Sequence, residues 1–273
     1  MTTATTERST SRWLTLARVR FSMELRQLFR DRQQVTFTFA FPMMLMVIFG
    51  SVFTGDIVPG VSFRLYFMAG MIASGIVYAA FQNLAIVIPL EREDGTLKRL
   101  RGTPMPKSAY FAGKLGTVVV IYVAQVALLL LLSSLLFHVK IPTALSAWVT
   151  FAWVSALGLS ACTLLGLAFS SIPRTAKGAP AVVTPLVLIL QFTSGVYFNF
   201  SGLPSWMQHF AAIFPLKWLT QGMRSVFLPA SLAAHEPSGS WQHPLTAVIL
   251  AVWIVIGAVW AVRSFRWQRR GED

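Results

Sequence analysis

The chain has 273 residues, of which 55% are hydrophobic and only 12% carry a charged side chain, against about 25% in an ordinary soluble domain. This composition excludes a water-soluble globular protein and predicts that most of the chain lies in lipid. The net charge of +13 matches the Lys and Arg bias of cytoplasmic loops in membrane proteins, so nucleic-acid binding is not required to explain it.

The first 34 residues precede any apolar run long enough to cross a bilayer. Residues 1–11 are small and polar, which predicts a disordered tail. Residues 12–33 place apolar side chains at helical spacing beside arginines, so we predict a cytoplasmic interfacial helix, with a solvated extension of the first span as the alternative. No cleavable signal peptide is expected, because the first strongly apolar run begins near Val35 and reaches membrane-spanning length.

Six apolar runs approach the roughly 20 residues that a helix needs to cross a hydrocarbon core of about 30 Å. They are Val35 to Phe53, Leu65 to Leu90, Phe111 to Phe137, Leu145 to Phe169, Val182 to Val196 with a few flanking residues, and Leu245 to Val262. Because they lack the alternation of barrel strands, backbone hydrogen bonding in lipid requires helices. The predicted fold class is an all-α membrane protein with six transmembrane helices within residues 34–262.

The distribution of Lys and Arg predicts the orientation of these spans. With both termini inside, the cytoplasmic segments 1–34, 91–114, 170–181 and 263–273 hold seven, six, two and four of these residues, or 19 of 23. The opposite side holds only Arg64, Lys140, Lys217 and Arg224. We therefore expect a multi-pass protein of the plasma (inner) membrane with cytoplasmic termini, in which residues 263–273 form a basic cytoplasmic tail.

The fourth span carries small residues at Gly158, Cys162 and Gly166, four positions apart on one helix face. Such a stripe permits close packing of another helix, either from the same chain or from a second subunit. Cys162 is the single cysteine of the chain, which excludes an intrachain disulfide and a cysteine metal cluster.

Between the fifth and sixth spans, Pro204, Pro215 and Pro229 delimit two short apolar helices. Both are too short to cross the bilayer, which predicts an interfacial or re-entrant hairpin that dips into the outer leaflet. The aromatic residues expected to anchor this hairpin are Trp206, Phe210, Phe214 and Trp218.

Catalytic and metal-binding patterns are not found in the sequence. The four histidines lie in or beside predicted extracytoplasmic loops without HExxH spacing, and no GxxxxGK phosphate loop is present. We therefore expect no catalytic residue, no metal site and no cofactor on this chain. Ionisable residues are scarce in the spans, which disfavours a proton-coupled carrier. Lys114 is expected to snorkel toward a cytoplasmic helix end.

The connection between the second and third spans reads LEREDGTLKRLRGTPMPKSAYFAGKL. Gly95 suits the left-handed turn that ends a helix, and residues 96–101 then suit a short amphipathic helix that Pro104 stops. This helix is expected to offer Leu97 and Leu100 to a partner groove.

That segment resembles the permeases of type-2 ATP-binding-cassette (ABC) exporters, in which an acidic pair, a Gly-Thr, a short helix and a Thr-Pro precede the third span. The residues that match in order are Glu91, Glu93, Gly95, Thr96, Leu97, Leu100, Thr103, Pro104, Gly113 and Lys114. The resemblance extends over the chain, since the interfacial helix, six spans and hairpin all fit, and FPLKWLTQGMR is similar to the family's segment before the last span.

The resemblance implies that residues 34–262 are a permease domain, and that the matched residues from Glu91 to Pro104 couple it to a separate ATPase. It further implies a dimer of permeases, taken here as a homodimer, bound to two copies of a cytoplasmic ABC ATPase that holds ATP and Mg²⁺. Membrane lipids and a hydrophobic small molecule are the other expected partners, and nucleic acid is not one.

We expect an exporter of a hydrophobic or amphipathic compound, such as a drug, an antibiotic or a lipid-like natural product. A pathway lined by Leu, Phe, Met and amide side chains offers no fixed charge to a small hydrophilic ion. A permease for polysaccharide or glycolipid export is the main alternative within the family. Outside it, a non-transporting membrane scaffold and an intramembrane enzyme are the alternatives.

Overall fold

The computed structural model describes residues 3–58 and 60–264. The described residues form the helices α1 (Thr3–Arg30), α2 (Arg32–Val52), α3 (Phe63–Ile76), α4 (Asn83–Glu93), α5 (Thr96–Arg101), α6 (Lys107–Phe137), α7 (Leu145–Phe169), α8 (Gly178–Thr193), α9 (Ser205–Ile213), α10 (Pro215–Phe227) and α11 (His243–Ser264). They also form a π-helix, η1 (Val77–Gln82), the 3₁₀ helices η2 (Phe200–Gly202) and η3 (Ala230–His235), and the antiparallel strands β1 (Asp56–Val58) and β2 (Val61–Ser62).

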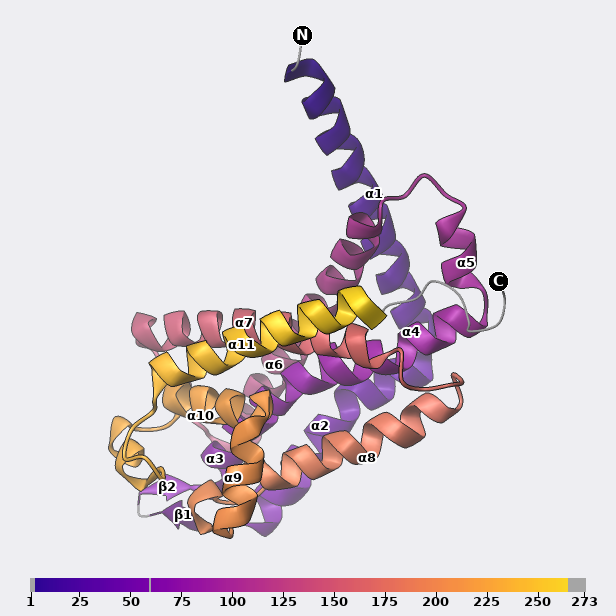
Figure 1. Ribbon diagram of the computed structural model, residues 1–273. Helices are drawn as coiled ribbons and strands as arrows, with labels where there is room; N and C mark the ends of the chain where they lie inside the picture. The colour runs from indigo at the N-terminus through magenta and orange to yellow at the C-terminus, as the bar shows by residue number, and fades with distance from the viewer. Residues whose placement is uncertain (1–2, 59, 265–273) are drawn as a thin grey trace.

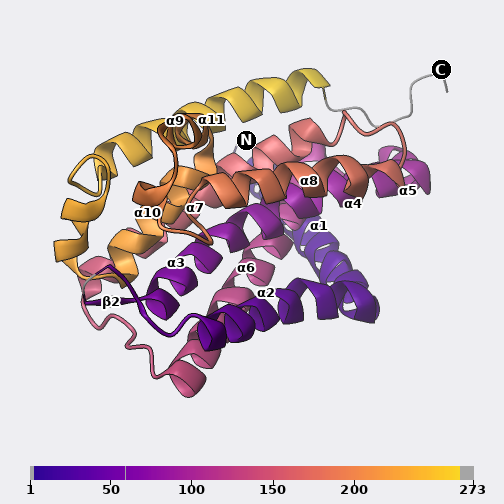
Figure 2. The same ribbon diagram turned by 90° about the horizontal axis from the view of Figure 1, so that it is seen from below.

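The helices form a bundle whose connections gather at two opposite ends (Figure 1). One end, here called the α5 end, contains α5, the starts of α6 and α8, and the last turn of α11. The other end, here called the hairpin end, contains β1, β2, α9 and η3. The direction of the long helices alternates between the two ends, as the predicted order of spans requires. Figure 2 shows α11 and α2 along opposite edges of the bundle.

Five helical segments of the described chain are long and apolar enough to cross a membrane. They are Arg32–Val52, Phe63–Glu93, Lys107–Phe137, Leu145–Phe169 and His243–Ser264. The predicted fifth span corresponds to α8, which has only 16 residues. At 1.5 Å per residue it is about 24 Å long. It ends at Thr193 rather than Val196, because Gly195 adopts φ +74° and turns the chain. The all-α membrane fold is confirmed, while a membrane crossing by α8, and with it the count of six spans, stays a prediction.

The N-terminal part of the chain differs from the sequence-based expectation. A disordered tail over residues 1–11 disagrees with the structure from Thr3 onward, because α1 is helical from there to Arg30. Extending a formed helix gains one hydrogen bond per residue fixed, which favours such continuation. The predicted helix 12–33 is interrupted at Asp31, whose carboxylate accepts a hydrogen bond from the N–H of Gln34 and caps α2. Most of the predicted basic tail, residues 265–273, lies outside the described residues.

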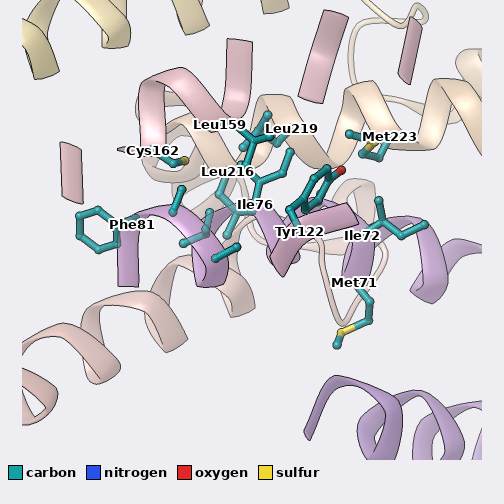
Figure 3. Close-up of a cluster of buried hydrophobic side chains, with 14 of the residues drawn as sticks. Met71, Ile72, Ile76, Phe81, Tyr122, Leu159, Cys162, Leu216, Leu219 and Met223 are labelled. Atoms are coloured by element: carbon teal, nitrogen blue, oxygen red, sulfur yellow. The ribbon is translucent and has the colours of Figure 1, made fainter. Parts of the chain in front are cut away.

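The second span is the centre of the bundle. It consists of α3, η1 and α4 in unbroken succession, and every residue from Tyr66 to Ile76 is buried. Its middle part, η1, is a π-helix, a rare form that is common at functional sites. Helices α7 and α10 pack against this span and enclose the apolar cluster of Figure 3, which includes Met71, Ile76 and Phe81.

The small-residue stripe of α7 packs inside the chain. A Cβ atom at Gly158 would lie 2.5 Å from a methyl group of Leu219, and one at Gly166 would lie 2.8 Å from the carbonyl oxygen of Phe81. Cys162 between them is buried in the same apolar cluster (Figure 3). The stripe is therefore covered by α10 and η1 of this chain, so the helices that pack against it come from the same chain rather than from a second subunit.

Candidate functional site

Four charged side chains meet at the α5 end and form a cluster, here called the ion cluster, of Arg20, Glu24, Glu91 and Lys114. Glu91 Oε1 lies 2.9 Å from Arg20 Nη2 and 2.7 Å from Lys114 Nζ. Lys114 Nζ also lies 2.9 Å from Glu24 Oε1, and Arg20 pairs with Glu24 one turn along α1. All four side chains are buried. Two cations and two anions balance, so the cluster buries no net charge.

The ion cluster joins α1, α4 and α6 because α1 approaches α6 closely. A Cβ atom at Gly113 would lie 2.7 Å from Arg20 Cγ, so glycine at this position permits the contact. Tyr110 completes the cluster, since its hydroxyl donates to Glu91 Oε2 at 2.7 Å and its ring lies 4.9 Å below the Arg20 guanidinium. Both oxygens of the Glu91 carboxylate are thus bonded, one by cations and one by a hydroxyl.

The next two residues of α4 contact the α7–α8 region. Arg92 Nη1 donates to the carbonyl oxygen of Ser170, which caps the end of α7, at 3.2 Å. Glu93 Oε2 accepts a hydrogen bond of 2.6 Å from the N–H of Ala176, in the connection that leads into α8. Three consecutive residues in the last turn of α4 therefore contact α1, α6, the end of α7 and the start of α8. We call this arrangement the α4 junction.

The short helix α5 follows this junction directly. Gly95 adopts φ +76°, which confirms the predicted left-handed turn. The N–H of Thr96 donates to Asp94 Oδ1 at 2.8 Å and helps to start the helix. After its last turn, Thr103 Oγ1 donates to the carbonyl oxygen of Leu100 at 2.7 Å, and the exposed Pro104 follows.

The side chains of α5 divide into an inner and an outer set. Leu97 is fully buried and belongs to the hydrophobic core, and Leu100 is partly buried against it. This corrects the expectation that Leu97 faces a partner. Leu97 lies in the first turn of α5, directly after the left-handed turn at Gly95, and its side chain packs back into the bundle. The exposed residues are Lys98, Arg99 and Arg101, so the outward surface of α5 is basic.

Sequence reasoning missed most of the ion cluster. Lys114 does not snorkel, because its ammonium is buried and paired with Glu24 and Glu91. Glu91 was singled out, but its partners Arg20, Glu24 and Tyr110 were not. The available signal was Lys114 itself, an ionisable residue two turns inside an apolar helix, since such residues need a partner in the protein interior.

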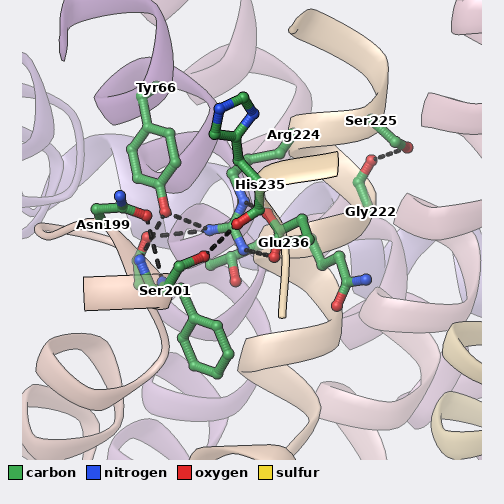
Figure 4. Close-up of polar contacts among 12 residues, drawn as sticks. Tyr66, Asn199, Ser201, Gly222, Arg224, Ser225, His235 and Glu236 are labelled. Atoms are coloured by element: carbon green, nitrogen blue, oxygen red, sulfur yellow. Dashed lines mark hydrogen bonds and ion pairs between the residues drawn. The ribbon is translucent and has the colours of Figure 1, made fainter. Parts of the chain in front are cut away.

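A second buried ion pair closes the hairpin end (Figure 4). Arg224 of α10 donates through Nε to Glu236 Oε1 at 2.8 Å, and through Nη1 to the hydroxyl of Tyr66 at 3.0 Å and the carbonyl oxygen of Gly195 at 3.2 Å. The Tyr66 hydroxyl also accepts from the N–H of Phe200 at 3.1 Å. The charge pattern assigned Arg224 to a loop, but it is fully buried. Its hydrogen bonds link α10 to α3, to the segment after α8 and to the segment after η3.

Lys217 lies seven residues before Arg224 on α10, about two helical turns away. Its Nζ is 3.6 Å from the ring centroid of Trp218. Burial lowers the pKa of Lys217 to about 8, against the opposing attraction of Glu236. The ammonium is therefore held by an aromatic face and an amide, Gln221, rather than by a carboxylate of its own.

The predicted hairpin exists as α9 and α10, but its two helices have different surroundings. Trp206 and Phe210 on α9 are exposed, with Trp206 at 66%. Trp218 on α10 is only 5% exposed because α10 packs between α3, α7 and α11, and Phe214 stacks on Trp253 of α11. A short apolar helix has the same kind of sequence whether lipid or protein covers it. The sequence therefore did not predict that α10 is buried while the aromatic residues of α9 are exposed.

The bundle interior also holds amide and hydroxyl groups. Gln191 of α8 accepts hydrogen bonds through Oε1 from Tyr78 of η1, at 3.1 Å, and from Tyr197. Its Nε2, like both amide atoms of the buried Gln125, has no partner among the described residues. These groups can hydrogen-bond a polar substituent of a ligand, and they carry no charge.

Comparison with known proteins agrees with this architecture. A family model described as ABC-2 type transporter matches residues 16–228, a range that includes the ion cluster, α5 and the hairpin. The chain is also 20% identical over 223 residues to "Putative transport permease YvfS" of Bacillus subtilis (strain 168), covering 80% of this chain and 81% of that protein. The chain, a multi-pass helical membrane protein, belongs to the ABC-2 type transporter family.

Proposed function

We propose that this chain is the membrane-spanning permease subunit of an ATP-driven exporter that moves a hydrophobic or amphipathic compound outward across the plasma membrane. The observation that carries the proposal is the α4 junction. Glu91, Arg92 and Glu93 contact α1, α6, the residue that caps α7 and the connection that leads into α8. A force applied to α5, one residue beyond a tight turn, reaches all these helices through short, charge-assisted bonds.

In this proposal the α5 end faces the cytoplasm, and α8 crosses the membrane as the fifth of six spans. The distribution of Lys and Arg supports the orientation. Two copies of an ABC ATPase bind the cytoplasmic face of a permease homodimer and supply ATP and Mg²⁺. The exposed Lys98, Arg99 and Arg101 of α5 suit acidic residues of such an ATPase, while the partly buried Leu100 contributes at the edge of the contact.

The interior supports the substrate class. Tyr78, Gln191 and Tyr197 form a neutral polar group on η1, α8 and the segment after it, and Gln125 offers further amide atoms that have no partner within the described part of the chain. A mainly apolar compound with a few hydrogen-bonding groups suits these surroundings. A polysaccharide or glycolipid exporter is the alternative within the family, and the exposed aromatic side chains of α9 suit a sugar chain.

The proposal is tested by purifying the full-length chain from its native host, identifying the ATPase that accompanies it, and reconstituting both in liposomes. We expect candidate hydrophobic compounds to stimulate ATP hydrolysis and to be transported. Replacing Lys98, Arg99 and Arg101 together by Glu should abolish co-purification of the ATPase without changing the melting temperature of the permease.

The matched control is Lys140→Glu, an exposed lysine at the hairpin end. It should leave co-purification unchanged. A scaffold would bind an ATPase without ligand-stimulated hydrolysis, and stimulation by oligosaccharides alone would favour the polysaccharide alternative. Unchanged ATPase binding by the triple variant would remove α5 from the contact.

A further inference from the structure

The guanidinium of Arg224 is fixed along one edge and offers its other edge to a carboxylate (Figure 4). Its Nη1 donates to the Tyr66 hydroxyl and to the carbonyl oxygen of Gly195, at 3.0 and 3.2 Å. Its Nε and Nη2 donate to the two carboxylate oxygens of Glu236, at 2.8 and 3.3 Å. Such paired bonds are the usual way in which arginine recognises a carboxylate. We call the edge formed by Nε and Nη2 the Arg224 fork.

The groups that fix the guanidinium and the group that occupies the fork lie in different parts of the chain. Tyr66 belongs to the buried second span. Gly195 follows α8 with φ +74°, and a Cβ atom there would lie 3.1 Å from Arg224 Nη1. Glu236 instead follows η3 directly, and the next four residues, 237–240, are exposed. A shift of this connector, residues 236–242, would therefore withdraw the carboxylate while the fork stays in place.

A second buried cation lies on the same face of α10. Lys217 precedes Arg224 by seven residues, or about two helical turns, and is only 6% exposed. Within the described part of the chain its ammonium contacts Gln221 and the Trp218 ring, and no carboxylate lies within ion-pair distance. The Glu236 charge attracts Lys217 and the Arg224 charge repels it. Two buried cations thus share one carboxylate, which favours an anionic ligand here over a neutral or cationic one.

We propose that the Arg224 fork binds the carboxylate of the exported compound, and that Glu236 occupies the fork until this compound displaces it. This role of Arg224 rests on the proposed function and deepens it, because it gives the amphipathic substrate its charged group. The Phe200 ring, whose centroid lies 5.5 Å from Lys217 Nζ, offers an apolar surface beside the fork. In the orientation proposed above the hairpin end is extracytoplasmic, so the fork lies where the compound leaves the bundle.

Binding to the full-length chain alone, in a neutral detergent, tests this role without transport or an ATPase. The probe is radiolabelled octanoate, a carboxylate with a short apolar tail, and octanol is its uncharged match. Glu236→Gln removes the competing carboxylate, so it should bind octanoate at least about tenfold more tightly than the parent chain. Arg224→Lys keeps the charge but removes the fork, so it should lose the preference for octanoate over octanol. Lys217→Gln in the Glu236→Gln background should weaken octanoate binding about fivefold.

A second measurement needs no change at the fork, so it serves even where Glu236→Gln fails to fold. On a Cys162→Ala background, Leu232→Cys places a reporter at a buried position of η3, close to the connector in sequence. Octanoate should speed its reaction with a maleimide at least about threefold, and octanol should not, because a ligand in the fork releases Glu236. The control for the binding assay is Asp56→Asn, an exposed carboxylate at the hairpin end, which should bind octanoate as the parent chain does.

Equal affinity for octanoate in the parent chain and in Glu236→Gln would overturn the proposal, as would equal binding of octanoate and octanol or an unchanged labelling rate at position 232. Such a failure would leave the exporter proposal intact where neutral compounds still stimulate ATP hydrolysis in the reconstituted complex. Octanoate binding without any stimulated hydrolysis would keep the fork as a carboxylate site and remove the exporter.

Discussion

Arg20 of α1 and Glu91 of α4 are 71 positions apart in sequence, yet their side chains form a buried ion pair with an N–O distance of 2.9 Å. The pair fixes the N-terminal helix to the last turn of the second span. Since Lys114 of α6 approaches the same carboxylate oxygen at 2.7 Å, one oxygen atom is shared by three helices. Glu91 is therefore the central residue of the ion cluster.

Replacing Glu91 by Gln should destabilise the protein strongly, because Arg20 and Lys114 then share only Glu24. Breaking a buried ion pair costs about 3–5 kcal/mol. The second change Lys114→Met restores the charge balance, so the double variant should lose less than the sum of the two single variants. The measurement is the free energy of unfolding in bicelles, and additive losses would contradict a coupled cluster. Asp56→Asn, at an exposed carboxylate of β1 at the other end of the bundle, serves as the control.

Removing the carboxylate charge at the hairpin end should open that end. In Glu236→Gln, the fully buried Arg224 keeps Tyr66 and Gly195 as partners but loses its only close anion among the described residues. On a Cys162→Ala background, we expect a cysteine at the buried position 200 to react with a membrane-impermeant maleimide at least about tenfold faster.

The control for this experiment is Asp56→Asn, an exposed carboxylate of β1 at the same end. It should leave the labelling rate at position 200 unchanged. Equal rates in the parent and in Glu236→Gln would show that the Arg224 pair does not close the hairpin end.

The two glycines of the α7 stripe should respond differently to alanine. At Gly166 the new Cβ meets backbone, the carbonyl oxygens of Phe81 and Ala80 at 2.8 and 3.0 Å, so two helices must separate. At Gly158 it meets the ends of the Leu219 and Ile76 side chains, which can change rotamer. We expect Gly166→Ala to cost about 1–3 kcal/mol and Gly158→Ala less, as melting temperatures in detergent would show. The reverse order would contradict the packing described here.

The proposed orientation predicts from which side of the membrane a reagent can label the α5 end and the hairpin end of the bundle. On the Cys162→Ala background, Arg99→Cys in α5 should react with an impermeant maleimide only after the cells are permeabilised. Lys140→Cys, exposed at the hairpin end, should react in intact cells. Labelling of position 99 from outside would reverse the orientation.

Much of the fold followed from local sequence patterns. Apolar runs located the five long spans, Gly95 and Pro104 delimited α5, and Pro204 and Pro215 delimited α9, because each of these features acts within a few residues. The same reasoning placed α8 with an error of a few residues at each end.

Long-range contacts could not be derived in this way. Nothing near Glu24 specifies Lys114, 90 positions later, as its partner. Likewise, the hydropathy of α10 does not show whether lipid or α3 covers it, and the charge of Arg224 does not identify Glu236 as its partner. A charged residue inside an otherwise apolar helix predicts that a partner exists, while its identity depends on how the helices pack.

The π-helix η1 has a mechanical consequence for the second span. Tyr66 attaches the α3 half of this span to Arg224, and Glu91 attaches the α4 half to Arg20 and Lys114, so both ends are held. A π-helical turn contains about one residue more than an α-helical turn. If this extra residue shifts along the span, each side chain that it passes turns by about 100° around the helix axis. The middle of the span, with Tyr78, can therefore change the direction of its side chains while both ends stay bonded.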